Sequence, residues 1–243
     1  MKIELGLTSF AENSDIVMPD GKHESISHAQ RIRNIVEEIE LADQLGLDIY
    51  GLGEHHRKDY AVSDPVTVLG AAAARTQHIK LSSAVTVLSS DDPVRVYERF
   101  STLDAVSNGR AEIMIGRGSF IESFPLFGYN LNDYEDLFNE KLQMLLKINK
   151  HEIISWEGKL RPSLEYTGIY PRVENGELPI WIAQVVRLNH HSELVRLAYL
   201  LRMLSLGEIL DDLHVILKYT NQLRYLTDMI LQNYLLVYTH GVM

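Results

Sequence analysis

The stretch Asp48-Ile-Tyr-Gly-Leu-Gly-Glu-His-His56 decides the fold, because a short apolar run ends in glycines and then in polar side chains. Before it, apolar residues recur at helical spacing from Ile32 to Leu45, and Gly46 ends that pattern as a left-handed helix cap would. After it, Pro65 begins a second helical stretch. A strand between two helices is the unit from which parallel α/β sheets are built.

The same unit recurs along the chain as far as Ala183. Apolar runs ending in small residues predict strands at Ile3–Thr8, Asp48–Leu52, Ile79–Leu88, Ala111–Ile115 and Ile180–Ala183. Helical spacing predicts helices from a serine cap at Ser25 or Ser27 to Leu45, and at Pro65–Ala74, Pro93–Val106 and Leu131–Asn149. Trp156-Glu-Gly158 predicts a hairpin insertion before the last strand.

Composition excludes several classes of protein. The chain has 243 residues, enough for one large domain or two small ones, and a formal net charge of -10 that argues against nucleic acid or anionic membrane as partner. It has no cysteine, so disulfides and thiolate metal sites are excluded. The N-terminus does not resemble a signal peptide and no apolar run is long enough to span a bilayer, so we expect a cytoplasmic protein.

The composition changes abruptly at Gln184. All 7 prolines precede it, glycine becomes rare after it, and leucine becomes frequent. A barrel or a doubly wound sheet needs turn residues at every junction between strand and helix, and this tail offers almost none. On pattern alone the tail could be a cap of leucine-rich helices, for example over 193–206 and 209–226. We therefore separate residues 1–183 from residues 184–243.

Three short segments could carry chemistry. Glu54, His55 and His56 follow the second strand, where a carboxylate and imidazoles can act as acid and base or donate to an anion, although they can equally be ordinary loop residues. Adjacent histidines are a poor zinc pair, so no metal site is predicted. The hydroxyl-rich end of Leu81–Leu88 suits a planar polar ligand. The glycines around Arg117 allow close backbone approach beside a cation.

The ordered combination of these motifs resembles the bacterial-luciferase-like flavin monooxygenases. The motifs that carry the resemblance are Gly53-Glu-His-His56, Ser82-Ser-Ala-Val-Thr-Val-Leu88, Asp92-Pro-Val-Arg95, Leu103-Asp104, Ser107-Asn-Gly-Arg110, Ile115-Gly-Arg-Gly118 and Phe124-Pro-Leu-Phe-Gly128. The resemblance covers residues 1–183 and implies an α/β fold of the (β/α)8 TIM-barrel type. Here we expect an incomplete barrel with about five family strands and a helical tail outside the family pattern.

The resemblance also implies a cofactor and its binding residues. Reduced FMN, or in some branches the deazaflavin F420, would bind at the carboxyl ends of the strands. The implied activity is oxygen-dependent oxidation of a small organic substrate such as an aldehyde. His55 matches the rim histidine that acts as acid or base near the flavin, with Glu54 beside it. Cofactor contacts would come from Ser83, Ala84, Val85, Arg117 and Gly118, and the bond between Ala84 and Val85 matches a non-prolyl cis peptide under the flavin ring.

The tail departs from the family at the loop that would hold the flavin phosphate. After Pro-Ile-Trp-Ile-Ala183 the family has a Gly-Gly loop followed by small polar residues and glutamate, whereas here Gln184-Val-Val-Arg-Leu-Asn-His-His191 follows. Read one frame over, the same bases can spell Gly-Gly-Ser-Thr-Glu-Ser-Ser-Phe-Arg. We therefore interpret residues 184–243 as an out-of-frame translation, which would leave an impaired barrel.

Two functional classes stay open on this sequence. One is a luciferase-like flavin-dependent monooxygenase served by a flavin reductase and assembled as a homo-oligomer. The other is a non-catalytic truncated remnant or a flavin-binding protein. Oxygen uptake that depends on flavin and on His55 would separate them.

Overall fold

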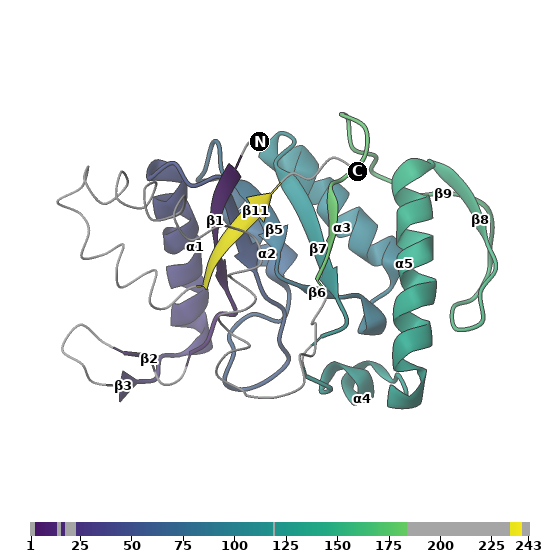
Figure 1. The fold of residues 1–243 in the computed structure, drawn as a ribbon, viewed down its shortest axis with the longest axis horizontal. Coiled ribbons are helices and arrows are strands. Elements are labelled where there is room, and N and C mark those ends of the chain that lie inside the picture. Colours follow the sequence, from purple (N-terminus) through teal and green to yellow (C-terminus); the bar gives the residue numbers. More distant parts are fainter. Residues whose placement is uncertain (1–2, 14–15, 18–22, 119, 184–233, 240–243) are drawn as a thin grey trace.

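The computed structural model describes residues 3–13, 16–17, 23–118, 120–183 and 234–239. A sheet with the strand order β10-β7-β5-β4-β1-β11 forms its centre, and helices pack along it in chain order (Figure 1). The strands of the sheet are β1 (Ile3–Ser9), β4 (Ile49–Leu52), β5 (Lys80–Ser83), β6 (Thr86–Val87), β7 (Ala111–Gly116), β10 (Ile180–Ile182) and β11 (Tyr234–Thr239). The longer helices are α1 (His28–Gln44), α2 (Pro65–Ala73), α3 (Pro93–Ser107) and α5 (Tyr134–Lys150).

The alternation of strand and helix up to β10 is confirmed. Strands β1, β4, β5, β7 and β10 are parallel neighbours, as repeated βα units require. This is the early part of a TIM-type barrel, and the described strands leave β10 and β11 at the two ends of the sheet. The barrel is therefore incomplete over the described residues.

Helix ends follow from local side chains. Ser27, rather than Ser25, caps α1 by accepting a hydrogen bond from the Gln30 N–H at 3.1 Å. Asp92 caps α3 in the same way, accepting from the Val94 N–H at 2.9 Å, and Pro93 occupies the first turn where its missing N–H costs nothing. Gly46 follows α1 with a φ of +79°, the left-handed conformation that glycine adopts without strain.

The third strand is interrupted where the sequence predicts continuity. The segment Ile79–Leu88 forms β5, breaks at a cis peptide bond between Ala84 and Val85, and continues as β6. Strand β5 lies between β4 and β7, whereas β6 pairs with β7 alone. A single-turn 3₁₀ helix, η1 (Leu88–Ser90), then leads into α3.

The region between β7 and β10 differs in detail from the prediction. A short helix, α4 (Ser123–Phe127), was not expected, and the predicted start of the next helix at Leu131 is a 3₁₀ turn, η2 (Leu131–Asp133), ahead of α5. The predicted hairpin exists, with β8 (Ile153–Trp156) antiparallel to β9 (Leu164–Gly168). Two further short strands, β2 (Ile16–Val17) and β3 (His23–Glu24), form a small separate ribbon.

One described part of the tail is a strand rather than a helix. Strand β11 pairs antiparallel with β1, from Ile3 opposite Thr239 to Thr8 opposite Tyr234. Tyrosine, valine and threonine favour strands, and β11 pairs with the backbone along one edge of β1. The helices expected over 193–206 and 209–226 lie outside the described residues.

The two faces of the sheet differ in polarity. The outer face carries Leu7, Leu52, Leu81 and Ile113, which pack against the helices in one buried cluster. The inner face carries ionic contacts: Lys80 Nζ lies 2.8 Å from Glu4 Oε2 and 2.9 Å from Glu112 Oε1. Burial acts to lower the pKa of Lys80, but its hydrogen bonds to both carboxylates outweigh that effect and raise it.

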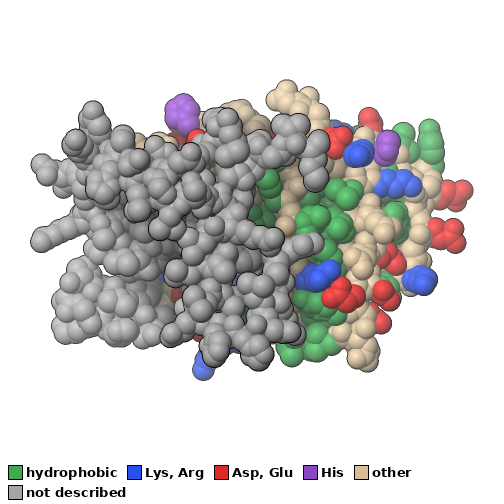
Figure 2. Space-filling model, in the orientation of Figure 1, with side chains coloured by type: hydrophobic (Ala, Val, Ile, Leu, Met, Phe, Trp, Pro, Cys, Tyr) green, Lys and Arg blue, Asp and Glu red, His purple; other side chains and the backbone are tan. Residues whose placement is uncertain are grey.

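Within the described ranges, no helix combines the length and the apolar character that a membrane span requires. Figure 2 shows charged side chains of both signs interspersed with hydrophobic ones on the coloured part of the visible face.

Candidate active site

The cis peptide bond between Ala84 and Val85 lies at the carboxyl end of β5, on the rim expected to bind the cofactor. The Ala84 N–H donates to the Leu52 carbonyl at 2.7 Å, which ties the bond to the end of β4. A Cβ on Gly116 would lie 2.7 Å from Val85 Cγ2, and one on Gly51 would lie 2.9 Å from Ala84 Cβ. Glycines on both flanking strands thus let the backbone approach this peptide closely. We call Ala84 and Val85 the bed.

His55 follows β4, on the same rim as the bed, and lies in a group of aromatic rings. Its imidazole is 4.2 Å from the Tyr60 ring, 5.2 Å from Phe120 and 5.5 Å from Phe10, measured between ring centroids. Burial lowers the pKa of His55, and the charges of His56 and Arg57 act in the same direction while Glu122 and Asp59 oppose them. The imidazole is therefore neutral at pH 7 and able to accept a proton.

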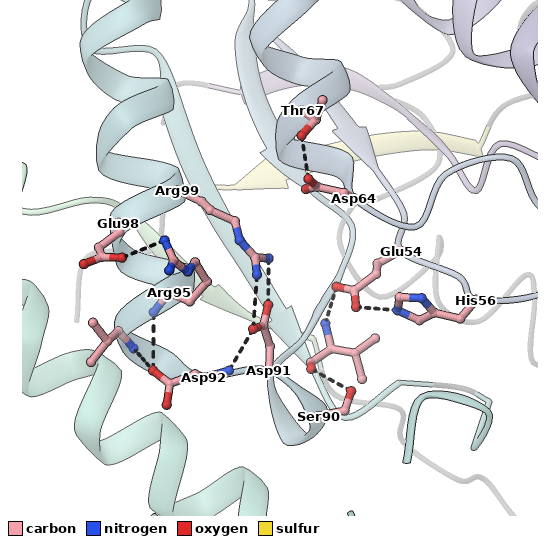
Figure 3. A network of polar contacts seen from close by, with 12 residues as sticks. Glu54, His56, Asp64, Thr67, Ser90, Asp91, Asp92, Arg95, Glu98 and Arg99 are labelled. Atoms are coloured by element: carbon pink, nitrogen blue, oxygen red, sulfur yellow. Dashed lines mark hydrogen bonds and ion pairs between the residues drawn. The ribbon is translucent and has the colours of Figure 1, made fainter. Parts of the chain in front are cut away.

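The Glu54 carboxylate is bound by neighbouring protein groups rather than exposed to solvent. One carboxylate oxygen accepts the Val87 N–H at 3.0 Å, and the other lies 3.0 Å from His56 Nε2 (Figure 3). Only 9% of the Glu54 side chain is exposed. Both oxygens are engaged, so this geometry favours a positioning role for Glu54 over direct proton transfer.

The segment after the bed is fixed by further polar contacts. The Ser90 hydroxyl donates to the Val87 carbonyl at 3.3 Å, and Arg99 donates to Asp91 at 2.8 Å (Figure 3). Asp92, besides capping α3, accepts from Arg161 Nε at 2.7 Å. The loop of the β8–β9 hairpin is thereby joined to the start of α3.

Two predicted cofactor residues have other partners in the structure. The Ser83 hydroxyl donates to the Met114 carbonyl at 2.9 Å and accepts the Met114 N–H at 3.1 Å, so it joins β5 to β7. Arg117 pairs with Glu135 at 3.0 Å and lies over the Phe138 ring at 5.0 Å, both on α5. The prediction that Arg117 reaches the flavin side would require that ion pair to open.

Gly118 does lie against the segment that follows the bed. It has a φ of +80°, and a Cβ there would approach Val87 Cγ1 to 2.9 Å. The structure therefore brings Glu54, Gly118, Ala84 and Val85 to one rim, and His55 follows β4 on that same rim.

Sequence reasoning missed the aromatic neighbours of His55. Phe10 directly follows β1, whereas Tyr60 and Phe120 lie in the connections that follow β4 and β7, so each is in a segment after a barrel strand. Position after a strand was the available signal, because the carboxyl ends of parallel strands meet at one edge.

The described residues fit the ring of a flavin better than its phosphate. The face of a flat ring suits the half-buried Val85 and the small residues around it, and His55 lies on the same rim with a lowered pKa. The expected cation, Arg117, is engaged with α5. Residues 184–191, where the family has its phosphate loop, lie outside the described residues.

Comparison with known proteins agrees with this geometry. A family model described as luciferase-like monooxygenase matches residues 12–185, and the chain belongs to that family. Among curated proteins, the uncharacterized protein y4vJ of Sinorhizobium fredii is 34% identical over 67% of this chain and 46% of its own length.

Solved structures give the same fold. The monooxygenase RslO1 of Streptomyces bottropensis aligns with a TM-score of 0.63 at 26% identity, covering 73% of this chain and 52% of its own. The oxygenating constituent of 3,6-diketocamphane monooxygenase from Pseudomonas putida, in complex with FMN, aligns with a TM-score of 0.62 at 22% identity, covering 74% and 51%. The second likeness speaks for the fold alone, and the chain spans about half the length of these relatives.

Proposed function

We propose that this chain is a flavin-dependent monooxygenase of the luciferase-like family. It would use a reduced flavin and O2 to oxidise a small organic substrate such as an aldehyde. The observation that carries the proposal is the Ala84–Val85 bed, flanked by Gly51 and Gly116 and lying on the same rim as the imidazole of His55, whose pKa is lowered.

The residues of this chain would contribute binding, orientation and one proton transfer. When bound, the reduced flavin supplies the electrons for the reaction with O2. Ala84 and Val85 would support one face of the ring, and Glu54 would hold the following strand in place through the Val87 N–H. His55 would accept or return a proton at its ring nitrogen, which its lowered pKa keeps free of a proton at pH 7.

Reduced FMN is the proposed cofactor and F420 the alternative. A fold neighbour with 18% identity is an F420-dependent secondary alcohol dehydrogenase, so the same fold accommodates the deazaflavin. The apolar bed does not discriminate between the two rings. A flavin reductase would supply reduced FMN, and we further propose a cytoplasmic homo-oligomer.

We propose that activity is impaired by the tail. The family match ends at residue 185, and Gln184 begins the segment that departs from the family loop for flavin phosphate. The same observation favours a second candidate function, a non-catalytic truncated remnant or flavin-binding protein. A chain that has the bed but lacks the phosphate loop could bind the flavin ring and still catalyse the reaction slowly.

Oxygen uptake tests the proposal and separates the two candidates. The purified chain is supplied with reduced FMN and n-decanal, and aldehyde-dependent uptake is measured for the wild type, His55→Ala and His151→Ala. His151 is the control because its side chain is exposed beyond the end of α5. We expect slow uptake that His55→Ala abolishes and His151→Ala preserves. Uptake that is unchanged in His55→Ala would refute the assigned role, and flavin binding without uptake would support the remnant.

A further inference from the structure

Lys141 is a buried amine that the proposed chemistry does not use. It lies on α5 with 3% of its surface exposed. Its Nζ donates to the Ser89 carbonyl at 2.7 Å and lies 3.8 Å from the centroid of the Tyr129 ring. The side chain therefore joins α5 to η1 and to the connection that follows α4.

The turn held by Lys141 directly follows the bed. Strand β6 comes after Val85, and η1 comes after β6. Glu54 holds this segment at the Val87 N–H, 3.0 Å away, and Arg99 holds it at Asp91, 2.8 Å away. Lys141 supplies a third contact from α5, at the Ser89 carbonyl. Three elements, the end of β4, α3 and α5, thus converge on the backbone that positions the bed.

Stability does not explain a charged amine at this place. Burial lowers the pKa of Lys141 to about 8, even though Asp91, Asp92 and Glu140 act to raise it, and Arg161 adds to the lowering. The folded protein therefore holds the charge less favourably than water does. Proteins retain unfavourable local features, such as a buried charge, mainly where the residue serves a function.

We propose that Lys141 is a positioning residue for the flavin bed, fixing the Leu88–Ser90 turn through the Ser89 carbonyl so that Ala84 and Val85 present a preformed surface to the ring. The inference rests on the proposed flavin site. It adds a residue on a helix remote in sequence from the rim motifs. The charged ammonium makes the stronger hydrogen bond to the Ser89 carbonyl and the contact with the Tyr129 ring. The positioning of the turn therefore depends on Lys141 being protonated.

A matched pair of lysines tests the proposal. Lys141→Met keeps an unbranched side chain that is one atom shorter and removes the charge. Lys147→Met is the control, because Lys147 also lies on α5 and donates to a carbonyl, that of Ser155, at 2.7 Å, but is exposed. We expect the dissociation constant for FMN to rise about tenfold in Lys141→Met, the scale of one lost charge-assisted hydrogen bond, and less than twofold in Lys147→Met.

Hydrogen exchange of the peptide covering residues 86–92 gives a readout that needs no flavin. We expect faster exchange of this peptide in Lys141→Met than in the wild type or Lys147→Met, with thermal unfolding checking that each variant is folded. Exchange and FMN affinity in Lys141→Met equal to those of Lys147→Met would overturn the proposal. Faster exchange in a chain that binds no FMN would support the positioning of the turn and refute the flavin site.

Dependence on pH separates positioning by the charge from simple packing. The groups facing Lys141 are Glu140 on α5, Asp91 and Asp92 before α3, Arg161 of the hairpin loop, and Tyr129, whose pKa burial raises. From pH 7 to 9 we expect wild-type affinity for FMN to fall toward that of Lys141→Met, whereas Lys141→Arg keeps its charge and its affinity. A Lys141→Met variant that follows the wild-type pH profile would overturn the role of the charge.

Discussion

At the scale of single residues, His55 has the environment of a base rather than of a cation. Its ring lies among Phe10, Tyr60 and Phe120, and burial lowers its pKa below 6.5. If the neutral form is required, kcat/KM is constant near neutrality and falls only when the pH drops below that lowered pKa. A pH profile of flavin-dependent turnover measures this.

The same profile in His55→Gln supplies the control. We expect the acid limb to disappear together with most of the activity, because glutamine keeps hydrogen-bonding capacity but does not titrate. An acid limb that persists unchanged in His55→Gln would assign the titration to another group.

Lys141 makes a second prediction at this scale, one of stability. Its folded pKa of about 8 lies below the ordinary value of 10.5, so between those pH values the unfolded chain binds more protons than the folded one. Stability contributed by this group therefore rises with pH through that window, by up to about 3 kcal/mol at roughly 1.4 kcal/mol per pKa unit. Urea unfolding of the wild type at pH 7 and pH 10 should show this rise relative to Lys141→Met. Parallel stability profiles would contradict the lowered pKa.

At the scale of elements, the close approach of the bed to β7 depends on a missing side chain. A Cβ on Gly116 would meet Val85 Cγ2 at 2.7 Å, and other Val85 atoms at 3.2 and 3.3 Å. We expect Gly116→Ala to destabilise the fold by about 1–3 kcal/mol, as overpacking does, and to weaken flavin binding. Chemical denaturation and flavin titration measure the two effects.

Gly70 is the matched glycine. It lies within α2, and a Cβ there would have no heavy atom within 4 Å. Gly70→Ala should stabilise by about 0.4–1 kcal/mol and leave flavin binding unchanged, because alanine favours helix. Equal effects of the two substitutions would show that contact with Val85 does not govern Gly116.

The elements also show what sequence reasoning could reach. The βα units were predictable because local residues mark their boundaries, such as Ser27 before α1 and Pro93 at the start of α3. The contacts of the Arg117 side chain were not predictable, because its partners Glu135 and Phe138 lie on a helix whose packing no local pattern specifies. The same limit hid Lys141, whose partner is a backbone carbonyl 52 residues away. Motif order located the rim, and tertiary packing decided which side chains face it.

At the scale of the whole molecule, the central question is the relation of the tail to the barrel. Strand β11 pairs antiparallel with β1, whereas β1, β4, β5, β7 and β10 form parallel pairs. A closed barrel of the family would place a parallel strand at that edge. An antiparallel segment there is consistent with a tail that did not evolve for the position.

The coding DNA across codons 180–215 tests the frameshift hypothesis. We expect the shifted frame to spell a Gly-Gly loop after Pro-Ile-Trp-Ile-Ala183 and to continue as family sequence. Codons that cannot encode that loop in any shifted frame would rule the hypothesis out.

The most direct test of the central claim compares FMN with riboflavin. The claim is that this chain keeps the bed for a flavin ring but has lost the loop for its phosphate. Titrating the purified chain with each ligand should give weak dissociation constants within about threefold of each other, both weakened by Gly116→Ala, because each phosphate contact would otherwise add at least a charge-assisted hydrogen bond. FMN binding tenfold or more tighter than riboflavin would show that the phosphate is held, and no binding of either would contradict the bed itself.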